Sequence, residues 1–165
     1  IKGQGNKIEV RIPPENETDF EQPFYQLAAA LKRHLHSRLK DKNAFVLKSI
    51  FSQFMLMPSL YLQAKNKKGI YKKYSFNIAA DNFSNRDWEI MDKVSKIRME
   101  WDYKINPVQQ IILTSDKYLI RKVGCKLAPK INTDILMKLD DSFYVEMSEL
   151  VRLMTKKIEA CNEKL

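Results

Sequence analysis

The sequence predicts an all-α fold, a bundle of five to six helices that follows a short extended N-terminal segment. Apolar residues recur every three or four positions along most of the chain, which is typical of amphipathic helices. The stretches between these periodic runs contain prolines and helix-capping residues. The length of 165 residues, with 44% apolar and 30% charged residues, suits one globular domain. We therefore expect residues 18–165 to form a single helical domain.

Residues 1–17 are expected to be an extended arm or strand. The run "KIEVRI" at residues 7–12 alternates apolar and polar side chains, and Pro13 and Pro14 end it. One strand cannot form a sheet alone. The segment therefore pairs with something outside this chain, lies as an arm, or forms an ordered tail.

The first helix is expected to begin near Thr18 or Asp19, to accept Pro23 in its opening turn and to run to about Lys40. Its polar side carries several basic residues, which fall together when the helix is viewed along its axis. The apolar stripe consists of Phe24, Leu27, Ala28, Leu31, Leu35 and Leu39, and the basic side consists of Lys32, Arg33, His36 and Lys40.

The second helix opens after Asn43 and ends or kinks at Pro58. Apolar residues surround most of its circumference, so we expect it at the centre of the bundle. A short helix follows within residues 74–83. Ser84 with Asp87 three positions later predicts the capped start of the next helix. The core-facing stripe of that helix is Ile90, Val94, Ile97, Trp101 and Ile105.

Asn106 and Pro107 supply a cap and a first-turn proline for a further helix, which should stop before Pro129. This helix is expected to run through Ile111, Ile112, Leu119 and Val123. Thr133 or Asp134 opens a short helical turn, and Asp140 or Asp141 caps the last long helix. The core-facing side of the last helix is Phe143, Met147, Leu150, Met154, Ile158 and Cys161.

The net charge of +9 is concentrated in one segment. Residues 32–73 contain eleven Lys or Arg and one acid, Asp41, whereas the charges of the remaining chain nearly cancel. Such a concentration of positive charge attracts polyanions. The alternative is a solvated lysine-rich loop whose tyrosines pack back onto the bundle. The expected nucleic-acid-binding residues are Lys32, Arg33, His36, Lys40, Lys65, Lys67, Lys68, Tyr71, Lys72, Lys73 and Tyr74.

The sequence contains no complete catalytic motif, so we expect a non-catalytic domain without cofactor or metal. The alternative is an enzyme whose site consists of converging polar groups that a single sequence does not show. His34 and His36 point about 200° apart on a helix and cannot bind one metal ion from it. Cys125 and Cys161 lack the spacing of a disulfide framework or a zinc site. This cysteine usage and the polar first residues suggest a cytoplasmic protein. The apolar stretch Ala44 to Ala64 contains Lys48 and Pro58, which favours a buried core helix over a membrane span.

Residues 70–104, "IYKKYSFNIAADNFSNRDWEIMDKVSKIRMEWDYK", combine a basic-aromatic turn, a short helix, a capped helix and a closing "IRMEW". This order resembles the helical region that follows the catalytic domain in some small prokaryotic nucleotidyltransferases. The catalytic signature of that family, a Gly-Ser turn followed by paired aspartates, is missing from this chain. The resemblance therefore implies an accessory or substrate-binding region that works beside a neighbouring catalytic domain.

The function expected from the sequence is binding of nucleic acid, or another phosphate-rich ligand, by a non-catalytic helical domain with a basic surface. One alternative is the accessory substrate-binding region of a nucleotidyltransferase-type enzyme. The other is a protein-protein interaction module, for which Met55, Met57 and Tyr61 near Pro58 are the candidate exposed apolar patch. No membrane partner is expected.

Overall fold

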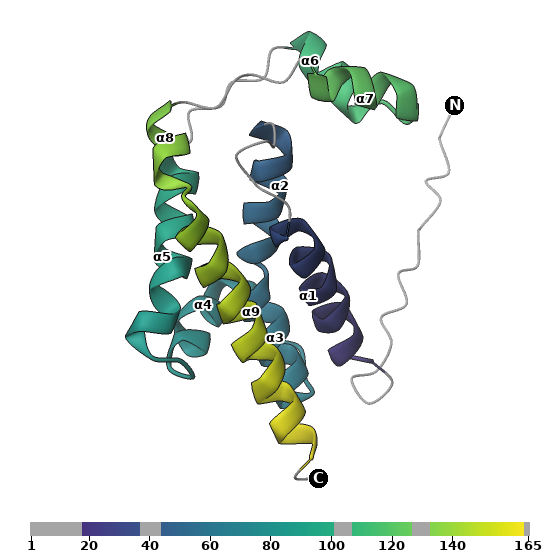
Figure 1. Cartoon of the computed structure of the whole chain (residues 1–165). Helices are drawn as coiled ribbons and strands as arrows, with labels where there is room; N and C mark the ends of the chain where they lie inside the picture. Colours follow the sequence, from purple (N-terminus) through teal and green to yellow (C-terminus); the bar gives the residue numbers. More distant parts are fainter. Residues whose placement is uncertain (1–17, 37–43, 101–106, 127–132, 164–165) are drawn as a thin grey trace, which may run out of the picture.

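The computed structural model describes residues 18–36, 44–100, 107–126 and 133–163. These residues form helices, without a strand among them, which confirms the all-α prediction (Figure 1). The predicted extended segment at residues 7–12 lies outside the described ranges. The helices are α1 (Glu21–Leu35), α2 (Ala44–Phe54), α3 (Met57–Asn66), α4 (Lys72–Ala80), α5 (Asn85–Glu100), α6 (Pro107–Thr114), α7 (Tyr118–Lys126), α8 (Thr133–Lys138) and α9 (Asp141–Asn162).

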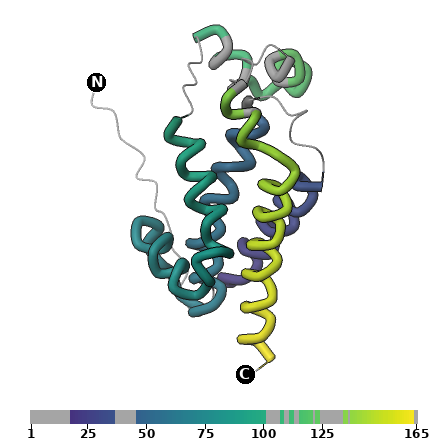
Figure 2. The backbone as a smooth tube through the Cα atoms, turned by 60° about the vertical axis from the view of Figure 1, so that its left-hand side comes forward, coloured from purple at the N-terminus to yellow at the C-terminus, as the bar shows by residue number. Residues whose placement is uncertain are grey.

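The bundle is organised around α9 and α3. Helix α9 packs against α1, α3 and α5, while α3 also packs against α1 and α4. Helices α6 and α7 pack against each other, and both views place them beyond one end of the bundle (Figures 1 and 2). The core is thus built by α1–α5, α8 and α9.

Helix α1 starts where the sequence predicts. The Asp19 carboxylate accepts hydrogen bonds from the backbone N–H groups of Glu21 at 2.9 Å and Gln22 at 3.0 Å, which satisfies donors of the first turn. The buried side chains are Phe24, Ala28 and Leu31, all on the predicted stripe. The helix ends at Leu35, before the predicted end near Lys40, which lies outside the described ranges.

The predicted interruption at Pro58 separates two helices, and the chain continues as α3 to Asn66. Pro58 lies in the first turn of α3, where its missing N–H has no helical partner to lose. Helix α2 buries Leu47, Ile50, Phe51 and Phe54, yet its Lys48 is exposed. Helix α2 therefore has a solvent-facing side and does not occupy the centre of the bundle as predicted.

The expectation of an exposed apolar patch near Pro58 is wrong. Met57 and Tyr61 are fully buried, and Met55 is half-buried against the core. The physical reason is the new helix that begins at Met57, because α3 packs between α1, α4 and α9. The apolar spacing that predicted the second helix does not continue past the break before Met57.

The helix caps predicted at Ser84 and Asp140 are confirmed. The backbone N–H of Asp87 donates to Ser84 Oγ at 3.2 Å, and the Ser84 hydroxyl donates to Asp87 Oδ2 at 2.6 Å, at the start of α5. Asp140 Oδ1 accepts from the backbone N–H of Phe143 at 2.8 Å at the start of α9. The buried residues of the two helices include Ile90, Val94, Ile97, Phe143, Met147, Leu150, Met154 and Ile158, and Cys161 is half-exposed.

The single helix predicted after Asn106 is wrong, because the chain breaks between Thr114 and Tyr118 into α6 and α7. The backbone N–H of Lys117 donates to Ser115 Oγ at 3.3 Å. Ser and Asp side chains offer the backbone such non-helical hydrogen bonds, which explains a turn at this point. Several apolar side chains of this helix pair are exposed: Val108, Ile111, Tyr118, Leu119, Ile120 and Val123.

Replacement of Tyr61 by Phe is expected to leave stability near pH 7 unchanged or slightly raised. The Tyr61 hydroxyl is buried and has no hydrogen-bond partner within the described residues, so its removal relieves a desolvation cost. Burial, with a smaller contribution from Cys161, raises the pKa of Tyr61 to about 12. The unfolded state loses this proton near pH 10 and the folded state keeps it, so folding stability falls as pH rises above 10.

Urea unfolding at pH 7 to 11 measures this difference. The natural protein should lose more unfolding free energy between pH 9.5 and 11 than Tyr61→Phe, by roughly 1 kcal/mol. Equal pH dependence of the two proteins would show that Tyr61 ionises freely when folded.

Candidate nucleic-acid interface

Contacts with the helical bundle hold the turn between α3 and α4 in place. Lys67 ends α3 with a left-handed backbone, φ 52° and ψ 36°. Ile70 is half-buried against the core, and its carbonyl accepts a hydrogen bond from Gln63 Nε2 at 3.3 Å. These contacts fix the path of the turn. The residues that follow Ile70 therefore begin from a fixed point of the backbone.

Two aromatic rings lie on the outside of this turn. Tyr71 is 70% exposed and Tyr74 is 58% exposed. Their ring centroids are 5.9 Å apart with an angle of 56° between the planes. The backbone N–H of Tyr74 donates to the Tyr71 carbonyl at 3.1 Å, which keeps the two residues in one turn. The rings thus face solvent instead of packing back onto the bundle.

Three exposed lysines lie beside these tyrosines in the sequence. Lys68, Lys72 and Lys73 are exposed, and none of them forms an ion pair with another described residue. Lys73 Nζ lies 5.8 Å from the centroid of the Tyr74 ring. The chain has no acidic residue between Asp41 and Asp81, so no neighbouring acid in sequence neutralises them. We call Lys68, Tyr71, Lys72, Lys73 and Tyr74 the lysine–tyrosine surface.

Lys65 and Lys67, predicted as part of the same site, have partners within the bundle. The Lys65 ammonium donates to Asn82 Oδ1 and lies 5.9 Å from the Tyr61 ring centroid. Lys67 forms an ion pair with Glu21 and donates to Asn162 Oδ1 at 3.3 Å. Lys67 therefore links the end of α3 to α1 and α9. These contacts compete with any contact between Lys67 and a ligand.

The basic residues of α1 lie away from the lysine–tyrosine surface. Lys67 meets Glu21 in the first turn of α1, whereas Lys32, Arg33 and His36 are exposed at the other end. Lys32 lies eleven positions after Glu21, which is about 16 Å along a helix. The structure does not bring the two predicted groups together, and Lys40 lies outside the described ranges.

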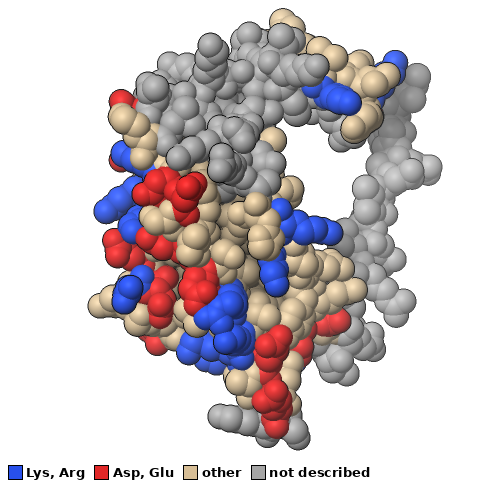
Figure 3. Space-filling view, viewed as in Figure 1, with Lys and Arg blue, Asp and Glu red and all other residues tan. Residues whose placement is uncertain are grey.

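Lys32 instead shares a groove with two basic residues that were not among the predicted site residues. Arg152 and Lys156 of α9 line this groove together with Lys32. Figure 3 shows basic side chains over the lower half of α9 and over α1, with acidic side chains toward the C-terminal end of α9. Arg152 and Lys156 are four residues apart on one helix face, and that spacing is the sequence signal that could have identified them.

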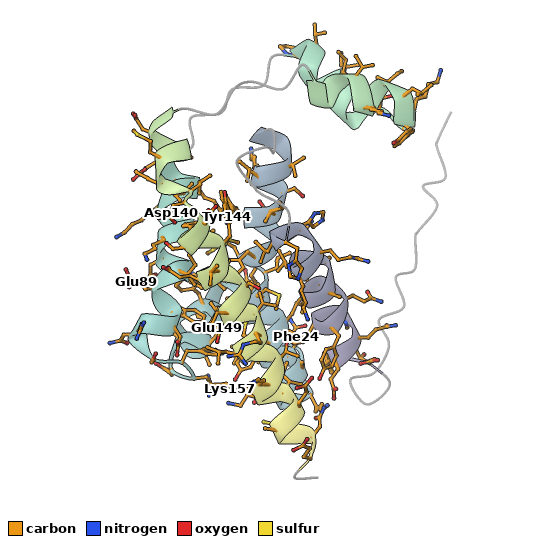
Figure 4. The ribbon with its side chains drawn as sticks, in the orientation of Figure 1. Phe24, Glu89, Asp140, Tyr144, Glu149 and Lys157 are labelled. Atoms are coloured by element: carbon orange, nitrogen blue, oxygen red, sulfur yellow. The ribbon has the colours of Figure 1, made fainter. Side chains whose placement is uncertain are left out.

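Acidic side chains gather between α5 and α9. Glu89 of α5 and Glu149 of α9 are labelled in Figure 4, and Asp87 and Glu146 line the same hollow. Lys93 bridges Glu89 at 3.4 Å and Glu146 at 2.9 Å, and the hydrogen bond to Glu146 raises the pKa of Lys93. Glu89 and Glu146 pair with Lys93, and Glu149 pairs with Arg152.

Within the described ranges, no group of three or more His, Cys, Asp or Glu side chains has the arrangement of a metal site.

None of the described helices combines the length and the apolar character that crossing a membrane requires.

Comparison of the chain with protein-family models, curated protein sequences and solved structures gives no match.

Proposed function

We propose that this helical domain binds single-stranded nucleic acid through the lysine–tyrosine surface. The observation that carries the proposal is a pair of exposed tyrosine rings beside three exposed lysines on one anchored turn. Aromatic rings stack on unpaired bases, and lysines contact the phosphates between them. This combination holds a strand without selecting its sequence.

The two tyrosine rings favour single-stranded nucleic acid over a duplex as the ligand. In a duplex the bases are stacked on one another, so Tyr71 and Tyr74 could contact only the backbone or the groove edges. An unpaired strand exposes base faces to both rings at once. The exposure of 70% and 58% leaves the rings accessible to such faces.

Charge removal tests the phosphate contacts. Replacing Lys68, Lys72 and Lys73 with Gln is expected to weaken binding of a labelled single-stranded RNA at low salt. For single strands each lost phosphate contact lowers the slope of log affinity against log salt by about 0.7, so three lost contacts lower it by about 2. Fluorescence anisotropy titrations at four salt concentrations measure both quantities.

A matched variant separates local contacts from net charge. Lys96, Lys117 and Lys122 are also exposed, and replacing these three with Gln removes the same total charge elsewhere. This control should keep most of the salt slope. Equal losses in the two triple variants would show that only the overall charge matters and would contradict the proposed surface.

The second candidate function is a protein-interaction module, and the exposed apolar side chains of α6 and α7 favour it. Residues 107–126 contain four bases and one acid, so the matching partner is an amphipathic segment with acidic residues around its apolar side. The RNA titration separates the two candidates. If the natural protein does not bind RNA more tightly than about 100 μM at low salt, the interaction module replaces nucleic-acid binding.

The lysine–tyrosine surface also suits the accessory substrate-binding region of a nucleotidyltransferase. Helices α4 and α5 carry most of the residues that resemble that region. In this version of the proposal the bound strand is the substrate of a neighbouring catalytic domain. Stimulation of such an enzyme by this chain, lost in the triple lysine variant, is the corresponding test.

A further inference from the structure

Helices α1 and α9 run antiparallel and leave a groove between them. Asn162 Nδ2, at the end of α9, donates to Glu21 Oε2, at the start of α1, at 3.0 Å. At the opposite end Leu35 and Ser148 line the same groove. Its volume is about 410 Å³. This volume falls within the range of sites for small organic ligands, about 300 to 1,000 Å³.

Three basic side chains line the groove, from its Leu35 end to its middle. Lys32 comes from α1, and Arg152 and Lys156 come from α9. Arg152 Nε donates to Glu149 Oε2 at 2.8 Å, so part of its charge is already compensated. Lys32 and Lys156 are exposed and form no ion pair within the part of the chain that the structure describes. Two ammonium groups from facing helices suit a phosphate between them.

The floor of the groove is apolar. Ala28 and Val151 are buried, Ala29 is exposed, and Leu35 is half-buried. The alanine methyl groups leave room for a flat group to lie against α1. Thr155 directs its hydroxyl to the Val151 carbonyl at 2.9 Å, so its hydrogen bond stays within α9. This floor offers contact area for an apolar, planar body.

The other end of the groove carries hydrogen-bond acceptors. Tyr25 of α1 and Glu159 of α9 line it. Burial raises the pKa of Tyr25, and the negative charge of Glu159 raises that pKa further. A carboxylate beside a neutral phenol accepts hydrogen bonds from hydroxyl or amino groups. Ligand groups at this end should therefore be donors.

We propose that the groove between α1 and α9 binds a small phosphomonoester with a flat, largely apolar body, of the class of a nucleoside monophosphate. The phosphate contacts Lys32 and Lys156, the flat body lies against the apolar floor of the groove, and donor groups reach Glu159. Lys32 and Tyr25 are seven residues apart on α1, which is about 10 Å along the helix. A nucleoside monophosphate spans a distance of this order.

This site is separate from the proposed nucleic-acid interface. The lysine–tyrosine surface belongs to the α3–α4 turn, and none of its five residues lines the groove. Either site can therefore fail its test without affecting the other.

Calorimetric titration of the full chain with adenosine 5′-monophosphate, adenosine and inorganic phosphate tests the proposal. The monophosphate is expected to bind saturably with one molecule per chain. Adenosine and inorganic phosphate should each bind at least about tenfold more weakly, because each lacks one half of the contacts. The double variant Lys32→Gln with Lys156→Gln should bind the monophosphate at least about tenfold more weakly than the natural protein.

Two further variants make the result specific. Lys117→Gln with Lys122→Gln removes the same charge outside the groove and should leave the affinity for the monophosphate unchanged. Ala29→Phe places a ring in the groove from an exposed position, so it should abolish monophosphate binding without unfolding the protein. Thermal unfolding and the RNA titration, both expected to be unchanged, verify that this variant is folded.

The proposal is overturned by any of three results: no saturable binding of the monophosphate, unchanged binding in the double Gln variant or in folded Ala29→Phe, or inorganic phosphate binding as tightly as the nucleotide. The last result would indicate an ion site only. A 5′-phosphorylated dinucleotide identifies the source of the ligand. Tighter binding than the monophosphate supports the end of a strand, and weaker binding supports a free nucleotide.

Discussion

Phe51→Ala is expected to lower the free energy of unfolding by about 3 to 5 kcal/mol. Phe51 is fully buried, and its ring packs edge-on against Phe143 of α9 at a centroid distance of 6.0 Å. Truncation removes this contact and leaves a cavity between α2 and α9. A loss of this size is a large part of the stability of a small domain.

Urea unfolding followed by circular dichroism measures the effect. Val145→Ala is the matched control, because Val145 lies on α9 near Phe143 but is 67% exposed. Its expected change is within about 0.5 kcal/mol. If Phe51→Ala unfolds like this control, the packing of α2 against α9 is not as the structure shows.

The double variant Tyr71→Ala with Tyr74→Ala is expected to weaken single-stranded RNA binding strongly while leaving the salt slope nearly unchanged. Loss of one base stacked on a ring costs about 1 to 3 kcal/mol. Each tyrosine therefore contributes about 5- to 150-fold in affinity, and the two effects combine if both rings stack. Both side chains are largely exposed, so little stability should be lost.

Replacing the same two tyrosines with Phe keeps the rings and removes only the hydroxyl groups. This variant should bind RNA within about threefold of the natural protein, because stacking depends on the ring face. Weak binding by the Phe variant would assign the contacts to the hydroxyl groups. Unchanged binding by the Ala variant would show that Tyr71 and Tyr74 do not stack on bases.

Features that depend on a few neighbouring residues could be predicted from the sequence. Asp140 caps α9 and Ser84 caps α5 as expected, because a cap needs only a short polar side chain and the N–H groups that follow it. The apolar stripe of α1 is buried for the same reason, since its spacing fixes one face. The basic segment, with Tyr71 and Tyr74 at its C-terminal end, was also visible in the sequence.

Features that depend on contacts between distant segments could not be predicted. The pairing of Lys67 with Glu21 joins positions 46 residues apart, and only the fold brings them together. The groove that Lys32 shares with Lys156 likewise exists only because α1 and α9 are antiparallel neighbours. Tyr61 is buried because α3 packs against α1, α4 and α9. The spacing of apolar residues on the two sides of Pro58 gives no information about this packing.

Photocrosslinking identifies the tyrosines that contact RNA. Single-stranded RNA that contains 4-thiouridine is bound to the full chain at low salt, irradiated and digested, and the crosslinked residue is identified by mass spectrometry. Tyr118 is an internal control, because it is 67% exposed and follows Lys117 on a different part of the chain. We predict that crosslinks concentrate on Tyr71 and Tyr74 and decrease when unlabelled RNA competes. Crosslinks that concentrate on Tyr118, or spread equally over all exposed tyrosines, would contradict binding at the lysine–tyrosine surface.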